Sequence, residues 1–328
     1  DLTQAEAVID LIDAETADAA ANAAGQLGGA LKRAIGPVYD GLTDLCSHFH
    51  AVLDYSDEDI EDFGAAELSG ALDRAGAALQ ELLATYEKGR HLRQGVRAVL
   101  LGKPNAGKSS LLNRLAGYDR VIVTDIAGTT RDTVEEPVRV GRVLLRLTDT
   151  AGIRETGDAI EALGVARSEQ AAREAELALF VCDGSQPLTD EDRRAIEAAK
   201  CAPRSLALCN KSDLPAAVSP DELPFDTVLT VSARTGAGLD ALPALLEGWF
   251  LGGNACDGSL LTNPRQFGAL DRASRAIERA KTGLCLGVTP DAVLMDVEEA
   301  MAALGEVTGR TVREDITNRI FERFCVGK

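Results

Sequence analysis

The chain has 328 residues, 45% of them hydrophobic and 26% charged, a globular composition on a length that predicts two domains. Its formal net charge of −18 excludes nucleic-acid binding through overall charge, so any RNA contact must be local or supplied by a partner. The absence of a long apolar run argues against a membrane protein, and seven cysteines without a Cys-x-x-Cys pair predict a reducing, cytoplasmic location.

The first 95 residues have helical patterns. Thr3-Gln4-Ala5-Glu6 has the form of a capping box, and residues 16–50 are rich in Ala with apolar residues at helical spacing. We expect Gly36-Pro37 to bend or interrupt this helix. The acid-rich stretch 54–62 is a solvated linker or a site for a metal or partner, and residues 68–92 return to helix.

The pattern changes at Val96 to short apolar runs alternating with helical stretches. The predicted strands are 96–101, 143–148, 177–183, 206–209 and 228–232, and the last helix of this region is 239–250. Buried strands that alternate with helices predict a mostly parallel sheet covered by helices.

Residues 262–324 are helical again. Because the first and last segments share this character, we expect one discontinuous all-α helical-bundle domain interrupted by an α/β domain. The expected boundaries are 1–95 and 253–328 for the helical domain, and 96–252 for the inserted domain.

A phosphate-binding motif follows the first predicted strand. Residues 102–109 read GKPNAGKS, which matches Gly-x-x-x-x-Gly-Lys-[Ser/Thr]. Its glycines let backbone N–H groups surround phosphate oxygens, Lys108 reaches the β- and γ-phosphates, and the Ser109 hydroxyl binds Mg²⁺. The helix that begins at Ser110 directs its positive end toward the anion. A P-loop site for a nucleoside triphosphate is therefore predicted.

Three further motifs close predicted strands in order. Residues 149–152 read DTAG, residues 210–213 read NKSD and residues 232–234 read SAR. The Asp213 carboxylate can accept hydrogen bonds from guanine N1–H and its exocyclic amine, whereas adenine would place an acceptor nitrogen against this carboxylate. The series predicts a Ras-like GTP site.

The switch region departs from Ras-like proteins. Residues 128–132 read GTTRD and offer Thr130 as a second hydroxyl for Mg²⁺. The residue after DTAG is Ile153, where Ras-like GTPases place a Gln that orients the attacking water. Because Ile cannot orient a water, hydrolysis must use another group or be slow.

Several segments together resemble the bacterial tRNA-modification GTPase family MnmE, also called TrmE. They are GKPNAGKSS at 102–110, TDIAGTTRD at 124–132, DTAGIRET at 149–156, the opening DLTQAEA and the terminal FCVGK at 324–328. The resemblance covers the whole chain, and it implies that the N-terminal folate-binding domain of the family would precede Asp1.

This resemblance implies GTP hydrolysis that is stimulated by K⁺. Asn105, Thr124, Ile126 and Thr129 would hold K⁺ beside the phosphates, and Glu161 would assist the water, with Asn105 and Lys108 as the other catalytic residues. The residues implied in GTP binding are Asn105, Ala106, Gly107, Lys108, Ser109, Ser110, Thr124, Asp125, Ile126, Ala127, Gly128, Thr129, Thr130, Asp149, Thr150, Ala151, Gly152, Asn210, Lys211, Asp213, Ser232, Ala233 and Arg234.

The resemblance also implies partners. The nucleotide domains of a homodimer would meet face to face, and a flavoprotein of the MnmG type would complete a heterotetramer that modifies the wobble uridine of certain tRNAs at C5. Cys325 would be needed for the modification, and Lys328 would contact a folate of the 5-formyltetrahydrofolate type in the full-length protein.

Other roles stay open for these residues. Asn105 can instead stabilise its loop, Glu161 can be a solvated acid, Arg154 can act as an arginine finger, and Cys325 can be a small buried residue. A ribosome-assembly GTPase is the alternative function, although such proteins usually carry a basic RNA-binding domain that we do not find in this sequence. A scaffold that uses GTP only to dimerise would not need the terminal thiol.

Overall fold

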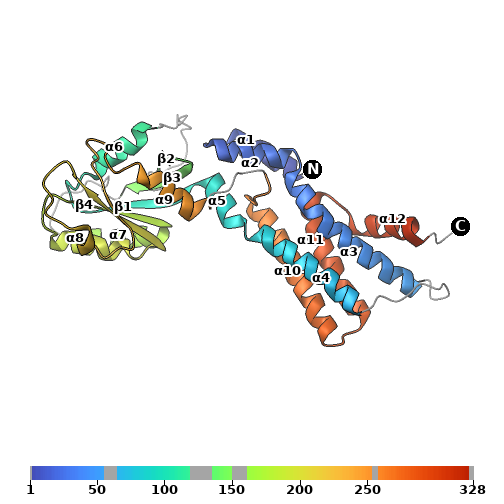
Figure 1. Cartoon of the computed structure of the whole chain (residues 1–328). Helices are drawn as coiled ribbons and strands as arrows, with labels where there is room; N and C mark the ends of the chain where they lie inside the picture. The colour runs from blue at the N-terminus through green and yellow to red at the C-terminus, as the bar shows by residue number, and fades with distance from the viewer. Residues whose placement is uncertain (1, 55–64, 119–134, 150–160, 253–257, 325–328) are drawn as a thin grey trace. The chain divides into compact units, whose positions relative to one another are not determined.

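The computed structural model describes residues 2–54, 65–118, 135–149, 161–252 and 258–324. The chain divides into two compact units (Figure 1). One unit comprises Asp1–Arg93 and Ala255–Lys328, and the other comprises Gln94–Asn254. The described part of the first unit is helical, and that of the second is a sheet with helices, so the predicted class, an α/β domain inserted into a discontinuous helical one, is confirmed.

Helices from both ends of the chain form the helical unit. They are α1 (Leu2–Ile12), α2 (Ala17–Leu27), α3 (Ala30–Asp54), α4 (Ala65–Leu83), α5 (Tyr86–Gln94), α10 (Pro264–Cys285), α11 (Pro290–Thr308) and α12 (Val312–Phe324). Helix α10 packs on α4 and α11, while α3 packs on α4, α11 and α12.

The core of this unit mixes side chains from the two separated segments. The first segment contributes Leu31, Leu42, Leu72 and Leu79, and the last contributes Leu270, Ile277, Val297 and Leu304. Each of these side chains is at most 1% exposed. Because apolar burial is the main favourable term in folding, neither segment can complete this core without the other.

The chain leaves and re-enters the helical unit at residues that are tied to α1 and α2. Arg93, near the end of α5, lies 2.7 Å from the Asp10 carboxylate of α1. On the return, Gln26 of α2 donates a hydrogen bond of 2.6 Å to the carbonyl of Leu260. These contacts fix, within the helical unit, the chain just before and shortly after the inserted domain.

The structure corrects two expectations about the first helices. Of the bend or interruption expected at Gly36-Pro37, the interruption is wrong, since α3 continues through Pro37. The break falls instead between α2 and α3, where Gly29 has a φ of 80°, a conformation that glycine adopts without steric penalty. The predicted helix 68–92 is divided into α4 and α5.

The α/β unit contains a six-stranded sheet in the order β2-β3-β1-β4-β5-β6. Strand β2 (Glu135–Val140) is antiparallel to β3 (Val143–Asp149). The other strands, β3, β1 (Val96–Leu101), β4 (Leu177–Asp183), β5 (Arg204–Asn210) and β6 (Val228–Thr230), run parallel to one another. All residues of β4 are buried, as expected for a central parallel strand.

Helices cover this sheet (Figure 1). They are α6 (Lys108–Tyr118), α7 (Glu161–Glu174), α8 (Asp190–Ala199) and α9 (Ala241–Phe250), and a short 3-10 helix lies at Pro220–Glu222. Helices α7 and α8 share a core with β1, β4 and β5 that includes Val99, Phe180 and Ile196. Helix α9 packs on β2 and β3.

Strand β2 was not predicted. It reads EEPVRV, and its two acids and Pro137 are unusual in a strand. Its place at the edge of the sheet explains why Pro137 is tolerated, because an edge strand leaves some backbone N–H positions unpaired.

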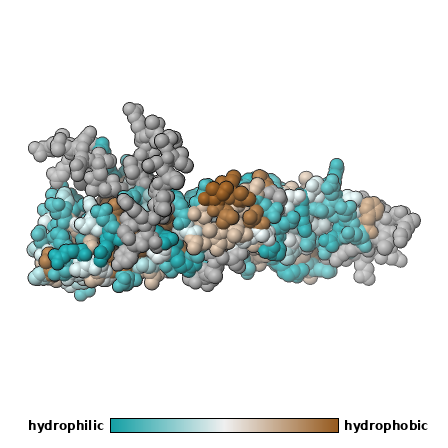
Figure 2. All heavy atoms as spheres, turned by 90° about the horizontal axis from the view of Figure 1, so that it is seen from above, coloured by the Kyte–Doolittle hydropathy of each residue, from teal (hydrophilic) through white to brown (hydrophobic). Residues whose placement is uncertain are grey.

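Helix α1 turns apolar side chains outward. Leu2, Val8, Ile9, Leu11 and Ile12 are exposed, and Figure 2 shows the brown patch that lies at this helix. Its buried residues are Thr3, Ala7 and Asp10. Across the described ranges, none of the helices has the length and apolar character that crossing a bilayer requires.

Candidate nucleotide-binding site

Three of the predicted motifs, at 102–109, 210–213 and 232–234, lie together at one edge of the sheet. Strands β1, β4, β5 and β6 are parallel, so the loops that follow them emerge at the same edge. The loop after β1 is the phosphate motif 102–109, and the loops after β5 and β6 are 210–213 and 232–234. The crevice outside the carboxyl ends of parallel strands is where open α/β sheets bind their ligands.

The phosphate loop follows a path that restricts its residues. Gly107 has a φ of 98°, and a Cβ atom there would lie 2.2 Å from Nδ2 of Asn210. Asn105, which is exposed, has a φ of 64°, a conformation that Asn tolerates better than most residues. The path of the loop therefore favours Gly at position 107 and Asn at position 105, and the missing side chain of Gly107 also leaves the backbone open to a ligand.

Lys108 occupies the first position of α6 and points back into the loop. Its Nζ donates hydrogen bonds to the carbonyls of Gly102 (2.5 Å) and Lys103 (2.9 Å). Ser109 and Ser110 are exposed in the first turn of α6, and the positive end of the helix dipole favours an anion there. The arrangement suits a bound phosphate group.

The Asp213 carboxylate is held in place by the loop after β6. Ser232 Oγ donates a hydrogen bond of 2.6 Å to one carboxylate oxygen, and Arg234 Nε lies 3.4 Å from the other. The hydrogen bond from Ser232 lowers the pKa of Asp213, so this group is an ionised acceptor near neutral pH.

Asn210 links the two loops instead of pointing to solvent. Its Nδ2 donates to the carbonyl of Ala106 at 2.9 Å, and its Oδ1 accepts from the backbone N–H of Ala233 at 2.9 Å. The residue is 2% exposed. In the structure, its side chain therefore joins the phosphate loop to the base-reading loops.

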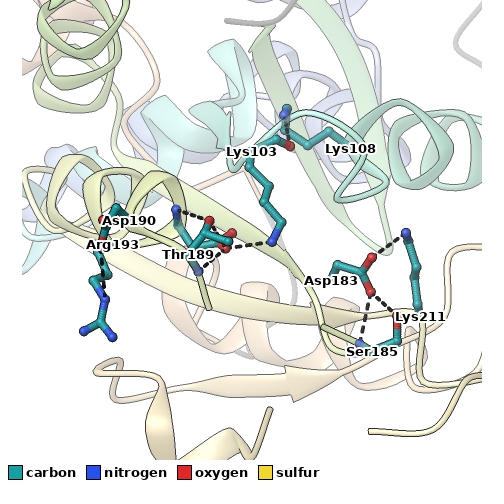
Figure 3. A network of polar contacts seen from close by, with 9 residues as sticks. Lys103, Lys108, Asp183, Ser185, Thr189, Asp190, Arg193 and Lys211 are labelled. Atoms are coloured by element: carbon teal, nitrogen blue, oxygen red, sulfur yellow. Dashed lines mark hydrogen bonds and ion pairs between the residues drawn. The ribbon is translucent and has the colours of Figure 1, made fainter. Parts of the chain in front are cut away.

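Asp183 is a site residue that the sequence analysis did not single out. Figure 3 shows its carboxylate between Lys211 and Ser185. Lys211 Nζ lies 2.6 Å from one oxygen, and the other accepts from Ser185 N and Oγ at 3.0 and 2.6 Å. Burial raises the pKa of Asp183, but the hydrogen bonds from Lys211 and Ser185 outweigh it, and the net shift is downward. An Asp that ends a buried strand was the signal for this residue.

Several predicted residues lie outside the described part of the chain. They are Thr124, Asp125, Ile126, Ala127, Gly128, Thr129, Thr130, Thr150, Ala151, Gly152, Cys325 and Lys328. Asp149 ends β3 and Glu161 begins α7, but their side chains are also outside what the structure describes.

The whole chain is similar in sequence to known proteins. The family model described as the MnmE helical domain matches residues 2–325. A tRNA modification GTPase MnmE from Roseiflexus sp. (strain RS-1) is 45% identical over 344 residues, which cover 100% of this chain and 73% of that protein. The chain belongs to the MnmE family. The protein of the same name from Enterococcus faecalis (strain ATCC 700802 / V583) is 39% identical, over 100% of this chain and 72% of that protein.

A solved structure is also similar to part of the chain. The G domain of the T. maritima FeoB iron transporter is 23% identical, with a TM-score of 0.34, over 45% of this chain and 94% of that one.

The residues of this MnmE-family chain fit a nucleotide and its cations. Lys108 already lies among the carbonyls of the phosphate loop, and Asp213 is an oriented, ionised acceptor. The Ser109 hydroxyl and the Asn105 amide both offer an oxygen on exposed parts of the loop. Hard cations prefer such ligands.

Proposed function

We propose that this chain hydrolyses GTP to GDP and phosphate, and that the cycle drives tRNA modification. The observation that carries the proposal is the meeting of the phosphate loop and the Asp213 loop at one sheet edge, joined by Asn210. An ionised acceptor at the base position favours guanine over adenine. The relatives named tRNA modification GTPase support the cellular role.

The proposed roles follow from the chemistry of each residue. The backbone N–H groups of 105–110 surround the phosphates, and Lys108, whose Nζ lies among the loop carbonyls, also donates to the β- and γ-phosphate oxygens. Ser109 and Thr130 hold Mg²⁺, while Asn105, with Thr124, Ile126 and Thr129, holds K⁺. These cations supply positive charge where negative charge develops during phosphoryl transfer. Glu161 assists the attacking water, because Ile153 cannot.

The finer role that we propose is modification of the wobble uridine of certain tRNAs at C5. The chain acts in the cytoplasm as a homodimer, with a flavoprotein of the MnmG type and with a folate of the 5-formyltetrahydrofolate type in the full-length protein. Cys325 serves the modification and Lys328 contacts the folate. The whole-chain similarity to tRNA modification GTPases supports this role.

We expect GTP hydrolysis to depend on K⁺. At equal ionic strength and saturating Mg²⁺, turnover in KCl should exceed turnover in NaCl by roughly tenfold or more, since a charge placed at the developing negative charge contributes effects of this order. Replacing Asn105 with Ala should remove most of the difference. Phosphate release from GTP measures both rates.

An exposed amide of the next helix provides the control. The variant Asn113→Ala, in α6, should keep the full response to K⁺. Equal turnover in the two salts would contradict the proposed K⁺ site, and absence of GTP turnover in both would contradict the proposed function.

A further inference from the structure

The phosphate loop is anchored through a side chain that does not face the phosphates. Lys103 is the second residue of the motif, and its Nζ lies 2.8 Å from Oδ2 of Asp192 in α8. The Lys103 side chain is 12% exposed and that of Asp192 is 0% exposed. Figure 3 shows Lys103 reaching across to the start of α8. An ion pair with so little exposure is screened only weakly by water and salt.

Asp192 is itself fixed by the start of its helix. Its Oδ2 also accepts from the backbone N–H of Thr189 at 2.9 Å and from Thr189 Oγ1 at 2.7 Å. The Asp192 N–H in turn donates to Thr189 Oγ1 at 3.4 Å, which completes a capping box. The other oxygen, Oδ1, is buried with no hydrogen-bond partner in the described structure. The contacts from Thr189 thus hold Oδ2, the same oxygen that Lys103 contacts.

We call the ion pair between Lys103 and Asp192 the clamp. The backbone carbonyl of Lys103 also accepts a hydrogen bond from Lys108. The Lys103 carbonyl accepts from Lys108 Nζ at 2.9 Å and from the Ala106 N–H at 3.3 Å. A shift of Lys103 would move this carbonyl together with the turn that precedes Lys108. The ion pair with Asp192 thus connects α8 to the position of the phosphate-binding backbone.

We propose that Asp192 is a positioning residue for phosphoryl transfer, acting through Lys103 on the phosphate loop. This inference rests on the proposed GTPase function. Binding of the nucleotide ground state depends on contacts to the base, on Lys108 and on the backbone N–H groups of the phosphate loop. The transition state requires closer alignment, and a misplacement of about 1 Å can lower the rate of an enzyme by about 10²-fold. Loss of the clamp should therefore lower kcat more than it weakens binding.

The test measures steady-state GTP hydrolysis, GDP affinity and thermal melting on the full chain. Asp192→Asn and Lys103→Met should each lower kcat by roughly ten- to a hundredfold, with GDP affinity changed by no more than about threefold. The double variant should be no slower than the slower single variant, because both changes remove the same interaction. Lys103→Arg keeps the charge and should retain most of the activity.

A neighbouring acid provides the matched control. Asp190 is in the same first turn of α8, its side chain is 94% exposed, and its Arg193 partner lies 3.9 Å away. Asp190→Asn should behave as the unchanged chain does. If Asp192→Asn melts below the assay temperature, Lys103→Met and Lys103→Arg decide the question.

Three results would overturn the inference. Unchanged kcat in both single variants would show that the clamp does not position the loop. A parallel fall of kcat, GDP affinity and melting temperature would show a structural role only. Absence of GTP hydrolysis by the unchanged chain would remove the proposed function and this inference with it, and so differs from the first two results.

Discussion

The Asp213→Asn variant is expected to bind GTP roughly ten- to a hundredfold more weakly than the unchanged chain. The amide retains one acceptor, but it places a donor NH₂ where guanine also presents donors. Xanthine has a carbonyl oxygen in place of the exocyclic amine of guanine, so this NH₂ can donate to it. Affinity for XTP should therefore rise as affinity for GTP falls.

Calorimetry with GTP, XTP and ATP measures this exchange. Ser232 and Arg234 contact the carboxylate and hold the side chain at this position, so the substitution should change its chemistry more than its place. Asp221→Asn, an exposed acid in the short helix Pro220–Glu222, is the matched control and should leave all three affinities unchanged. Unchanged GTP affinity in Asp213→Asn would contradict the assignment of the base-reading residue.

The Cys325→Ser variant should abolish tRNA modification by the full-length protein while GTP hydrolysis stays near its normal rate. Cys325 belongs to the segment Ala255–Lys328 of the helical unit, whereas the proposed nucleotide site lies within Gln94–Asn254. A hydroxyl is a far weaker nucleophile and acid than a thiol, so a chemical role would not survive the exchange. Nucleoside mass spectrometry of tRNA and phosphate release measure the two activities.

Another cysteine of the helical unit controls for this exchange. Cys285, the last residue of α10, is exposed, and Cys285→Ser should preserve both activities. A large loss of GTPase rate in Cys325→Ser would mean that the tail acts on the nucleotide site, and the separation of the two activities would then be wrong.

Much of the fold could be predicted because its signals are local. The phosphate motif stands between a buried strand and a helix, and the NKSD and SAR motifs close strands, so parallel topology alone brings them to one edge. Strand β2 was not predicted because its residues lack the apolar pattern of a buried strand. They include Pro137, which is tolerated at the edge of a sheet.

The supporting contacts of the site could not be predicted, since they join residues that are distant in sequence. Lys103 and Asp192 are 89 residues apart, and Asn210 reaches Ala106 across 104 residues. Nothing in either local pattern identifies the partner. Asn210 is an example: its motif predicted a contact with the nucleotide, but in the structure its buried amide links two loops.

The proposed function makes the α/β unit a guanine-specific hydrolase. The most direct measurement is phosphate release by this chain from GTP and from ATP, in KCl with saturating Mg²⁺. We expect sustained release from GTP and none above background from ATP, because the Asp213 carboxylate would meet an acceptor nitrogen of adenine. Equal release from the two nucleotides, or bound GTP that is not hydrolysed, would contradict it.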